Sequence, residues 1–178
     1  MPHERPLRYD LPAWAPVFHT VALLVFHGVA PFGVSLLSAR HGWSAGGPAD
    51  WNLLGLLPVA GGLTILVWII MLHYREAPKR GWRMEATPFE PTQYLIVYGP
   101  YRYSRNPIFL GHVTIWGGWA LYYGSLALVV AVAVMWILLA FVIVPYEERG
   151  LVRQLGEPYL RYQRQVGRWF GRGSTTAH

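Results

Sequence analysis

Long apolar segments alternate with short polar ones along this chain. Apolar residues run from Trp14 to Leu37, from Trp51 to His73 and from Pro107 to Pro145, and the last two runs contain no Asp, Glu, Lys or Arg. A helix needs roughly 20 such residues to cross a bilayer. The first two runs therefore each predict one transmembrane helix, and the third is long enough to predict two.

The third run contains a turn signal near its middle. Tyr122-Tyr123-Gly124-Ser125 is typical of a tight turn, so the run predicts a helical hairpin with arms at Ile108 to Tyr122 and Leu126 to Val144. The first arm is short, which favours a tilted or protein-sheltered helix. In the second run Pro58 predicts a kink. The expected fold is an all-α membrane bundle of four transmembrane helices.

The segment after the last apolar run has a different, helical periodicity. Apolar side chains recur at steps of three and four residues, and arginines occupy another face. Gly156 followed by Pro158 predicts the end of one helix and the start of another. Such a stripe is typical of a helix on the membrane surface, and we also expect it to form a cytoplasmic C-terminal cap. The stripe consists of Leu151, Leu155, Tyr159, Tyr162, Val166 and Trp169.

Composition and charge support a membrane location. Apolar residues make up 53% of the 178 residues and charged residues only 13%, whereas soluble chains carry roughly 25% charged residues. Of the 15 Lys and Arg residues, only Arg40 lies outside the segments that four crossings place on one side. The positive-inside rule then puts both termini in the cytoplasm. This distribution explains the net charge of +6 without a nucleic-acid partner.

The length predicts a single membrane domain over residues 1–178, with an N-terminal two-helix part at 1–74 and a second part at 85–170. The first residues contain acids and prolines and lack a small-residue cleavage site, so we expect no removable signal peptide. Cysteine is absent, which excludes disulfides and thiolate metal sites.

An aromatic-rich segment before the third apolar run is the first candidate for chemistry. It ends in Tyr101-Arg102-Tyr103-Ser104-Arg105-Asn106-Pro107, where Pro107 predicts a helix start and Asn106 its cap. A helix N-terminus beside Arg105 favours a carboxylate or phosphate. The alternative interpretation is a capped helix with interfacial Tyr and Arg anchors.

Two adjacent acids, Glu147 and Glu148, follow the fourth predicted span. Acids at the C-terminus of a helix meet the negative end of its dipole, so a positive group is expected nearby. That group is either a basic side chain, with Arg102, Arg105 and Arg149 as the candidates, or a cationic ligand.

Histidines within the apolar runs form a weaker candidate. His112 is a titratable group at membrane depth and so a functional candidate, although a hydrogen-bonded packing histidine is the simpler interpretation. His19 and His27 lie in the first run, but the spacing does not favour a metal site. Gly61-Gly62 and Gly117-Gly118 indicate close helix packing, and no dinucleotide or P-loop motif is present.

The two clusters resemble the isoprenylcysteine carboxyl methyltransferase and phospholipid methyltransferase superfamily of membrane enzymes. The matching segments are GPYRYSRNPIFLG, an apolar hairpin, and EERGLVRQLGEPYLRYQRQVGRWF, in that order over roughly residues 93–170. The resemblance implies methyl transfer from S-adenosylmethionine, bound on the cytoplasmic side, to a lipid or lipid-like acceptor. It implies a catalytic role for Arg105, Asn106 and Glu148. The implied cofactor-binding residues are Gln93, Tyr94, Leu95, Ile96, Tyr101, Asn106, Pro107, Ile108, Phe109 and Glu147.

The chain departs from the prenylcysteine branch of that superfamily at two positions. Asn106 stands where that branch has His, and Ile143 stands where it has an Arg thought to face the substrate. An amine headgroup is therefore at least as suitable an acceptor as a prenyl-type carboxylate. The expected location is a bacterial inner membrane. The alternative functions are an NADPH-dependent membrane reductase of the sterol-reductase type and a non-catalytic membrane module.

Overall fold

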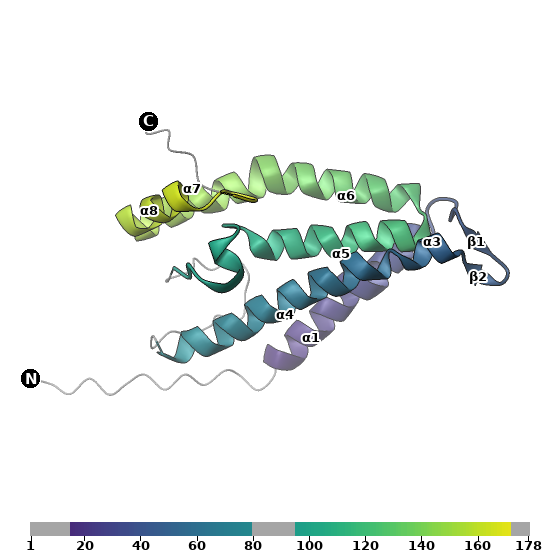
Figure 1. Cartoon of the computed structure of the whole chain (residues 1–178), viewed down its shortest axis with the longest axis horizontal. Coiled ribbons are helices and arrows are strands. Elements are labelled where there is room, and N and C mark those ends of the chain that lie inside the picture. The colour runs from purple at the N-terminus through teal and green to yellow at the C-terminus, as the bar shows by residue number, and fades with distance from the viewer. Residues whose placement is uncertain (1–14, 80–94, 172–178) are drawn as a thin grey trace, which may run out of the picture.

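The computed structural model describes residues 15–79 and 95–171, and helices make up most of this part of the chain (Figure 1). The strands β1 (Trp43–Ser44) and β2 (Gly47–Pro48) pair as a small antiparallel hairpin. The helical elements in chain order are α1 (Ala15–Leu24), η1 (Val25–Val29), α2 (Ala30–Ser35), α3 (Asp50–Leu53), α4 (Leu56–Lys79), η2 (Gly99–Arg102), α5 (Pro107–Tyr123), α6 (Leu126–Leu138), η3 (Leu139–Ile143), α7 (Val144–Leu155) and α8 (Glu157–Gln165).

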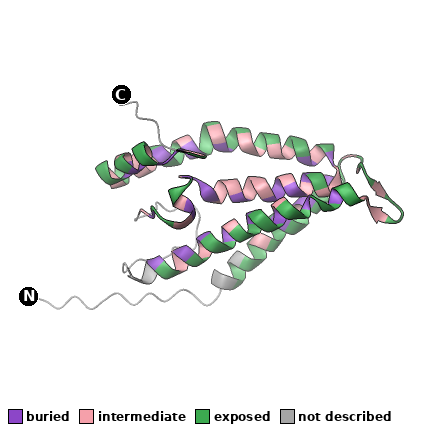
Figure 2. Cartoon of the chain, viewed as in Figure 1, coloured by how far each residue is buried: buried purple, intermediate pink, exposed green. Residues whose placement is uncertain are grey.

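The helices run along the long axis of the molecule, with the β hairpin at one end and α7–α8 at the other (Figure 1). Buried and half-buried residues follow α5, whereas the outer faces of the surrounding helices are largely exposed (Figure 2). The core between α4 and α5 contains Val59, Leu66 and Ile115.

Two helices in the described part are long and apolar enough to cross a membrane, namely Asp50–Glu76 and Leu126–Leu155. Only 28% and 17% of their most apolar windows are buried inside the protein, so most of their apolar side chains face outward, as lipid-facing helices require. The helix at Thr20–Ser35 is apolar but shorter. α5 has 17 residues, about 26 Å of helix, slightly less than the roughly 30 Å hydrocarbon core. The arrangement with four spans therefore stays a prediction.

Prolines shape the two longest helical paths. A π-helical turn precedes Pro31 and Pro145 in the same way, because η1 ends at Val29 and η3 ends at Ile143. Proline has no N–H and its ring crowds the carbonyl four residues back. A π turn changes the local hydrogen-bond pattern, and both helices continue past the proline. The last helical path consequently extends to Leu155, beyond the predicted end at Val144.

Pro58 lies in the first turn of α4, where no intrahelical N–H bond is needed. The helical path is interrupted just before it, at Leu54 and Gly55, where the hydrogen bonds tighten to Leu54 N–Trp51 O and Gly55 N–Asn52 O. The predicted kink at Pro58 is thus replaced by a break between α3 and α4.

Glycines bring the backbones of α4 and α5 into contact. A Cβ added to Gly118 would lie 2.6 Å from the Gly55 carbonyl oxygen, and one added to Gly62 would lie 2.7 Å from the Gly111 carbonyl oxygen. Close packing is therefore confirmed for Gly62 and Gly118. A Cβ at the neighbouring Gly61 or Gly117 would meet nothing within 4 Å, so the prediction was wrong for these two glycines.

A tight turn joins α5 to α6 as predicted. Gly124 has a left-handed backbone (φ +56°) that favours glycine, and Ser125 caps α6 by accepting a hydrogen bond from the Leu128 N–H at 3.4 Å. The fully buried amide of Asn52 lies nearby. Its Nδ2 donates toward the carbonyl oxygens of Leu121 and Tyr122, at 3.1 and 2.9 Å, which satisfies the C-terminal carbonyls of α5.

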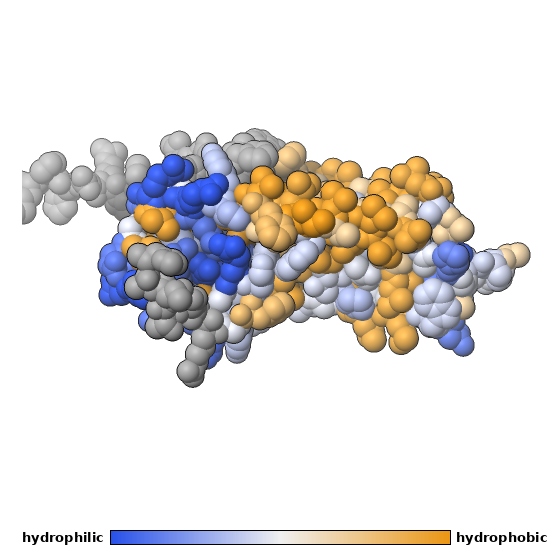
Figure 3. Space-filling model, turned by 90° about the horizontal axis from the view of Figure 1, so that it is seen from above, coloured by the Kyte–Doolittle hydropathy of each residue, from blue (hydrophilic) through white to orange (hydrophobic). Residues whose placement is uncertain are grey.

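The basic residues separate as the positive-inside pattern requires. In the described part, arginines other than Arg40 belong to the α7–α8 end, which is hydrophilic in Figure 3, whereas the surface over α6 is apolar. Arg40 lies at the opposite end, with its guanidinium 5.1 Å from the Tyr123 ring and 5.2 Å from the Phe32 ring. Cation–π contact stabilises this arginine at the β-hairpin end.

Candidate functional site

The segment before α5 and the C-terminal tail are bound together by backbone groups, although about 60 residues separate them. Arg105 N–H donates to Gly167 O at 3.1 Å, and the Asn106 side-chain amide donates to Arg168 O at 3.0 Å. Ser104 Oγ donates to the same Arg168 oxygen at 3.2 Å. The two clusters that carry the sequence resemblance therefore form one site.

Tyrosines complete this junction. Tyr162 donates its hydroxyl to the Tyr101 carbonyl oxygen at 2.6 Å, and the Tyr101 hydroxyl lies 3.1 Å from His73 Nε2. Burial, together with nearby Glu148, raises the pKa of Tyr159 to about 12, and burial also raises the pKa of Tyr162 above its usual value. Both phenols therefore remain protonated, and Tyr162 acts as a hydrogen-bond donor.

The apolar stripe of the tail faces the protein. Tyr159, Tyr162 and Val166 are buried and pack against Leu95 and Tyr101 of the preceding segment. The stripe thus covers the start of α5, and lying on the membrane surface is not its only role.

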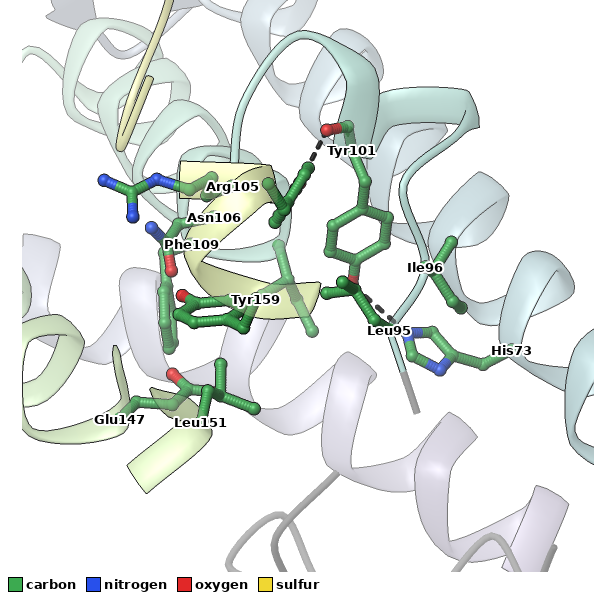
Figure 4. A pocket seen from close by; sticks show the side chains of 12 residues that line it. His73, Leu95, Ile96, Tyr101, Arg105, Asn106, Phe109, Glu147, Leu151 and Tyr159 are labelled. Atoms are coloured by element: carbon green, nitrogen blue, oxygen red, sulfur yellow. Dashed lines mark hydrogen bonds between the residues drawn. The ribbon is translucent and has the colours of Figure 1, made fainter. Parts of the chain in front are cut away.

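A cavity of about 80 Å³ lies at this junction (Figure 4). α4 contributes a wall through His73, α5 contributes its first turn, and α7 and α8 close the other side. The lining residues are His73, Leu95, Ile96, Tyr101, Arg105, Asn106, Ile108, Phe109, Glu147, Leu151, Tyr159 and Tyr162.

Most residues that the resemblance implied for cofactor binding line this cavity. They are Leu95, Ile96, Tyr101, Asn106, Ile108, Phe109 and Glu147. Pro107 is buried as the first residue of α5 and does not belong to the lining. Gln93 and Tyr94 lie outside the described residues.

The adjacent acids of α7 face different surroundings. Glu147 lines the cavity. Glu148 is buried (6% exposed) and accepts hydrogen bonds from Arg168 Nε and Nη2 at 3.1 and 2.7 Å, with Arg105 Nη1 3.1 Å from its other oxygen. Arg105 is therefore the partner among the three candidate arginines, and Arg168 is a second one that the sequence pattern did not indicate.

This arrangement differs from the predicted one in two respects. Glu147 lies in the first turn of α7 and Glu148 follows it, and α7 continues to Leu155, seven residues beyond Glu148, so the C-terminal dipole penalty does not arise. The guanidinium of Arg105 points away from Tyr101 and His73 in Figure 4 and is engaged by Glu148. Arg105 thus contacts the cavity while its charge is held by an acid outside the cavity lining.

Asn106 occupies the predicted N-cap position of α5, but its side chain does not cap the helix. Its amide donates to the tail carbonyl of Arg168, and its own backbone N–H donates to Ser104 Oγ at 3.0 Å. A tertiary contact has replaced the local one, because the amide binds a backbone oxygen from a distant segment.

Four residues of the lining were not among the predicted site residues: His73, Leu151, Tyr159 and Tyr162. His73 ends the second apolar run and is followed, after Tyr74, by Arg75 and Glu76, so its position at the polar end of a span was the available signal. Leu151, Tyr159 and Tyr162 belong to the apolar stripe, whose direction only the packing of α7 and α8 reveals.

The histidines at membrane depth bind each other. His112 Nδ1 lies 2.8 Å from His27 Nε2, and the rings stack with centroids 4.9 Å apart. This geometry agrees with the packing interpretation of His112, which is outside the cavity lining. The side chain of His19 is not described, and no group of three or more metal-ligating side chains occurs in the described part.

The cavity suits S-adenosylmethionine chemically but is small for it. Glu147 supplies a carboxylate for a cationic group, and Tyr101, Phe109 and Tyr159 supply aromatic surface for a sulfonium or a flat base. Its volume of about 80 Å³ is below the roughly 300–1,000 Å³ of small-molecule pockets. The whole cofactor therefore needs more space than the described residues enclose.

Comparison with known proteins identifies a family. A family model described as phospholipid methyltransferase matches residues 52–157, which is more than half of the chain. The matched region extends from α3 to the start of α8 and includes both acids of α7 and the start of α5. No curated protein matches, and no solved structure matches.

Proposed function

Because the chain belongs to the phospholipid methyltransferase family, a family of membrane methyltransferases, we propose that it transfers a methyl group from S-adenosylmethionine to a lipid-borne nucleophile. The favoured acceptor is an amine headgroup, with a prenyl-type carboxylate as the other lipid-like class. The enzyme resides in a membrane with both termini in the cytoplasm.

One observation carries this proposal. Residues 95–109 and 147–162 come from separate parts of the sequence, yet together they enclose a cavity with one carboxylate and several aromatic rings. The cavity lies at the end of the molecule where most arginines are found, which is the hydrophilic end in Figure 3. A polar cofactor from the cytoplasm and an acceptor from the bilayer can meet there.

S-adenosylmethionine, when bound, supplies a methyl group on a positively charged sulfur. Glu147 stabilises positive charge in the cavity, and Tyr101 and Phe109 form apolar walls that exclude water from it. The hydrogen bonds from Tyr162 to Tyr101 and from Asn106 to Arg168 hold these walls in position. Methyl transfer is an in-line displacement that depends on positioning, so these residues act by orientation and not by a catalytic triad.

Binding measurements on the purified protein distinguish this proposal from the alternatives. Isothermal titration is expected to show binding of S-adenosylhomocysteine and none of NADPH. Binding of NADPH alone indicates the reductase, whose phosphate-rich cofactor is poorly matched to Glu147, and binding of neither indicates a non-catalytic module.

A transfer assay identifies the acceptor. Membranes containing the protein are incubated with S-adenosylmethionine labelled in its methyl group, and the lipids are extracted and separated. The label is expected in an amine-headgroup lipid. Absence of labelled lipid, despite binding of S-adenosylhomocysteine, contradicts the proposed acceptor class.

A further inference from the structure

A second, wider cavity lies on the other side of Glu148. It holds about 450 Å³, and its described lining shares no residue with the first cavity. Glu147 belongs to one lining and Glu148 to the other, so adjacent residues of α7 separate the two spaces. The wider cavity lies between α7 and the α8 tail and is lined by Pro145, Glu148, Arg149, Val152, Arg153, Gln163 and Arg168; we call it the arginine groove.

The arginine groove carries excess positive charge. Arg149, Arg153 and Arg168 face one acid, Glu148, which is itself bound by Arg105 and Arg168. Arg149 and Arg153 are exposed and have no ion-pair partner among the described residues. They lie four residues apart on α7 and therefore share a face of the helix. Two unpaired guanidinium groups on one wall favour a phosphate, which guanidinium binds with bidentate geometry.

The groove continues into an apolar surface. α7 extends η3 without a break, and Phe141, Val142 and Tyr146 immediately before the arginines are 75%, 56% and 68% exposed. Figure 3 shows the apolar surface over α6 meeting the hydrophilic end of the molecule. A soluble phosphate has no apolar groups that could contact that surface. A phospholipid, in contrast, places its acyl chains and its phosphate on the two sides of such a boundary.

We propose that the arginine groove binds an anionic phospholipid that is distinct from the methyl acceptor. The phosphate lies between Arg149, Arg153 and Arg168, and the acyl chains lie along the exposed face of α6 and η3. An amine headgroup is a poor occupant, because its own cation is repelled by the three guanidinium groups. A headgroup without an amine, such as that of phosphatidylglycerol, is the expected ligand.

Occupancy of the groove also strengthens the first site. Arg168 takes part in both, since its guanidinium holds Glu148 and its carbonyl oxygen accepts from Asn106 at the cavity. A phosphate beside Arg168 fixes the tail against the start of α5. Bound lipid is therefore expected to raise the thermal stability of the protein.

The test uses the full chain purified in a mild nonionic detergent. Phosphatidylglycerol, phosphatidylcholine and glycerol phosphate are added separately, and the unfolding midpoint and lipid affinity are measured. Phosphatidylglycerol is expected to raise the midpoint by about 5 °C, and the other two are expected to leave it unchanged. An equal effect of glycerol phosphate overturns the lipid assignment, and an equal effect of phosphatidylcholine overturns the charge argument.

Two double variants locate the site. R149Q/R153Q is expected to bind phosphatidylglycerol at least tenfold more weakly, whereas R161Q/R164Q, which removes the same charge from exposed positions on α8 outside the groove, retains affinity within twofold. Equal weakening in both variants means unspecific attraction and overturns the proposal. Unchanged affinity for S-adenosylhomocysteine in R149Q/R153Q shows that the variant is folded and keeps this result separate from the proposed function. If that variant does not fold, R153Q alone is measured, and an affinity equal to that of the unaltered chain overturns the proposal.

Discussion

The two ends of the α4–α5 pair use opposite means to satisfy their polar groups. At the β-hairpin end, glycines let the helices touch, and the buried amide of Asn52 satisfies the last carbonyls of α5. At the α7–α8 end, charged and aromatic side chains from distant segments surround the start of α5 and leave a cavity. The difference teaches that one helix pair can be rigid at one end and receptive at the other, because space remains only where large side chains hold backbones apart.

The largest expected effect comes from the buried acid at the receptive end. Replacing Glu148 by Gln leaves the guanidinium of Arg105 buried without a counter-charge, which destabilises the fold by about 3 kcal/mol, since removing one partner of a buried pair costs roughly 3–5 kcal/mol and Arg168 is partly screened by solvent. Chemical denaturation in detergent measures this loss. Glu157→Gln breaks an ion pair in which both side chains are more than half exposed, so it serves as the control and is expected to change stability little. A stability loss in the control as large as in Glu148→Gln contradicts a stabilising role for the ion pairs of Glu148 with Arg105 and Arg168.

At the β-hairpin end, a single added methyl group is expected to disrupt the packing of α4 against α5. Gly118→Ala places a Cβ 2.6 Å from the Gly55 carbonyl oxygen, and overpacking of this kind costs about 2 kcal/mol. Gly117→Ala, one residue away with open space around it, is expected to stabilise α5 slightly, because alanine is the better helix former. Equal unfolding midpoints of the two variants are incompatible with backbone contact between α4 and α5.

The third effect separates binding from stability at the receptive end. Glu147→Gln removes the carboxylate of the cavity and is expected to weaken binding of S-adenosylmethionine, which carries the cationic sulfur, about tenfold, equivalent to about 1.4 kcal/mol, while the unfolding midpoint stays constant. Titration calorimetry and thermal unfolding of the same preparation measure both quantities. If Glu147→Gln lowers the midpoint as Glu148→Gln does, the two acids do not have separate roles.

The smallest effect concerns the hydroxyl that fixes the site wall. Tyr162→Phe removes the hydrogen bond to the Tyr101 carbonyl oxygen, which is worth about 1 kcal/mol, and should weaken S-adenosylhomocysteine binding by a few-fold. Tyr146→Phe alters an exposed hydroxyl outside both cavities and is the matched control. Identical affinities in the two variants show that the Tyr162 bond does not position the wall.

Hydropathy along the chain was sufficient for the helices, the Gly124 turn and the helix boundary at Gly156, because each depends on local backbone preference and on the length of an apolar run. The sequence also indicated part of the contact between α4 and α5. Gly62 and Gly118, which approach Gly111 and Gly55, are small residues in apolar helices, and such residues permit close approach. Resemblance to a known superfamily indicated most residues of the cavity lining.

Other features were decided only by the tertiary structure. The neighbouring sequence does not distinguish Glu147 from Glu148. Because successive residues of a helix point in different directions, Glu147 faces the cavity and Glu148 faces Arg168 of the tail. Asn106 does not cap its helix, and its side-chain amide instead donates a hydrogen bond to the carbonyl oxygen of Arg168, which belongs to a distant segment of the chain. The sequence by itself determined which segments are helical and which end is charged, since those depend on near neighbours. The partners of each charge depend on contacts between residues far apart in the chain, so only the folded arrangement of α5, α7 and α8 determines them.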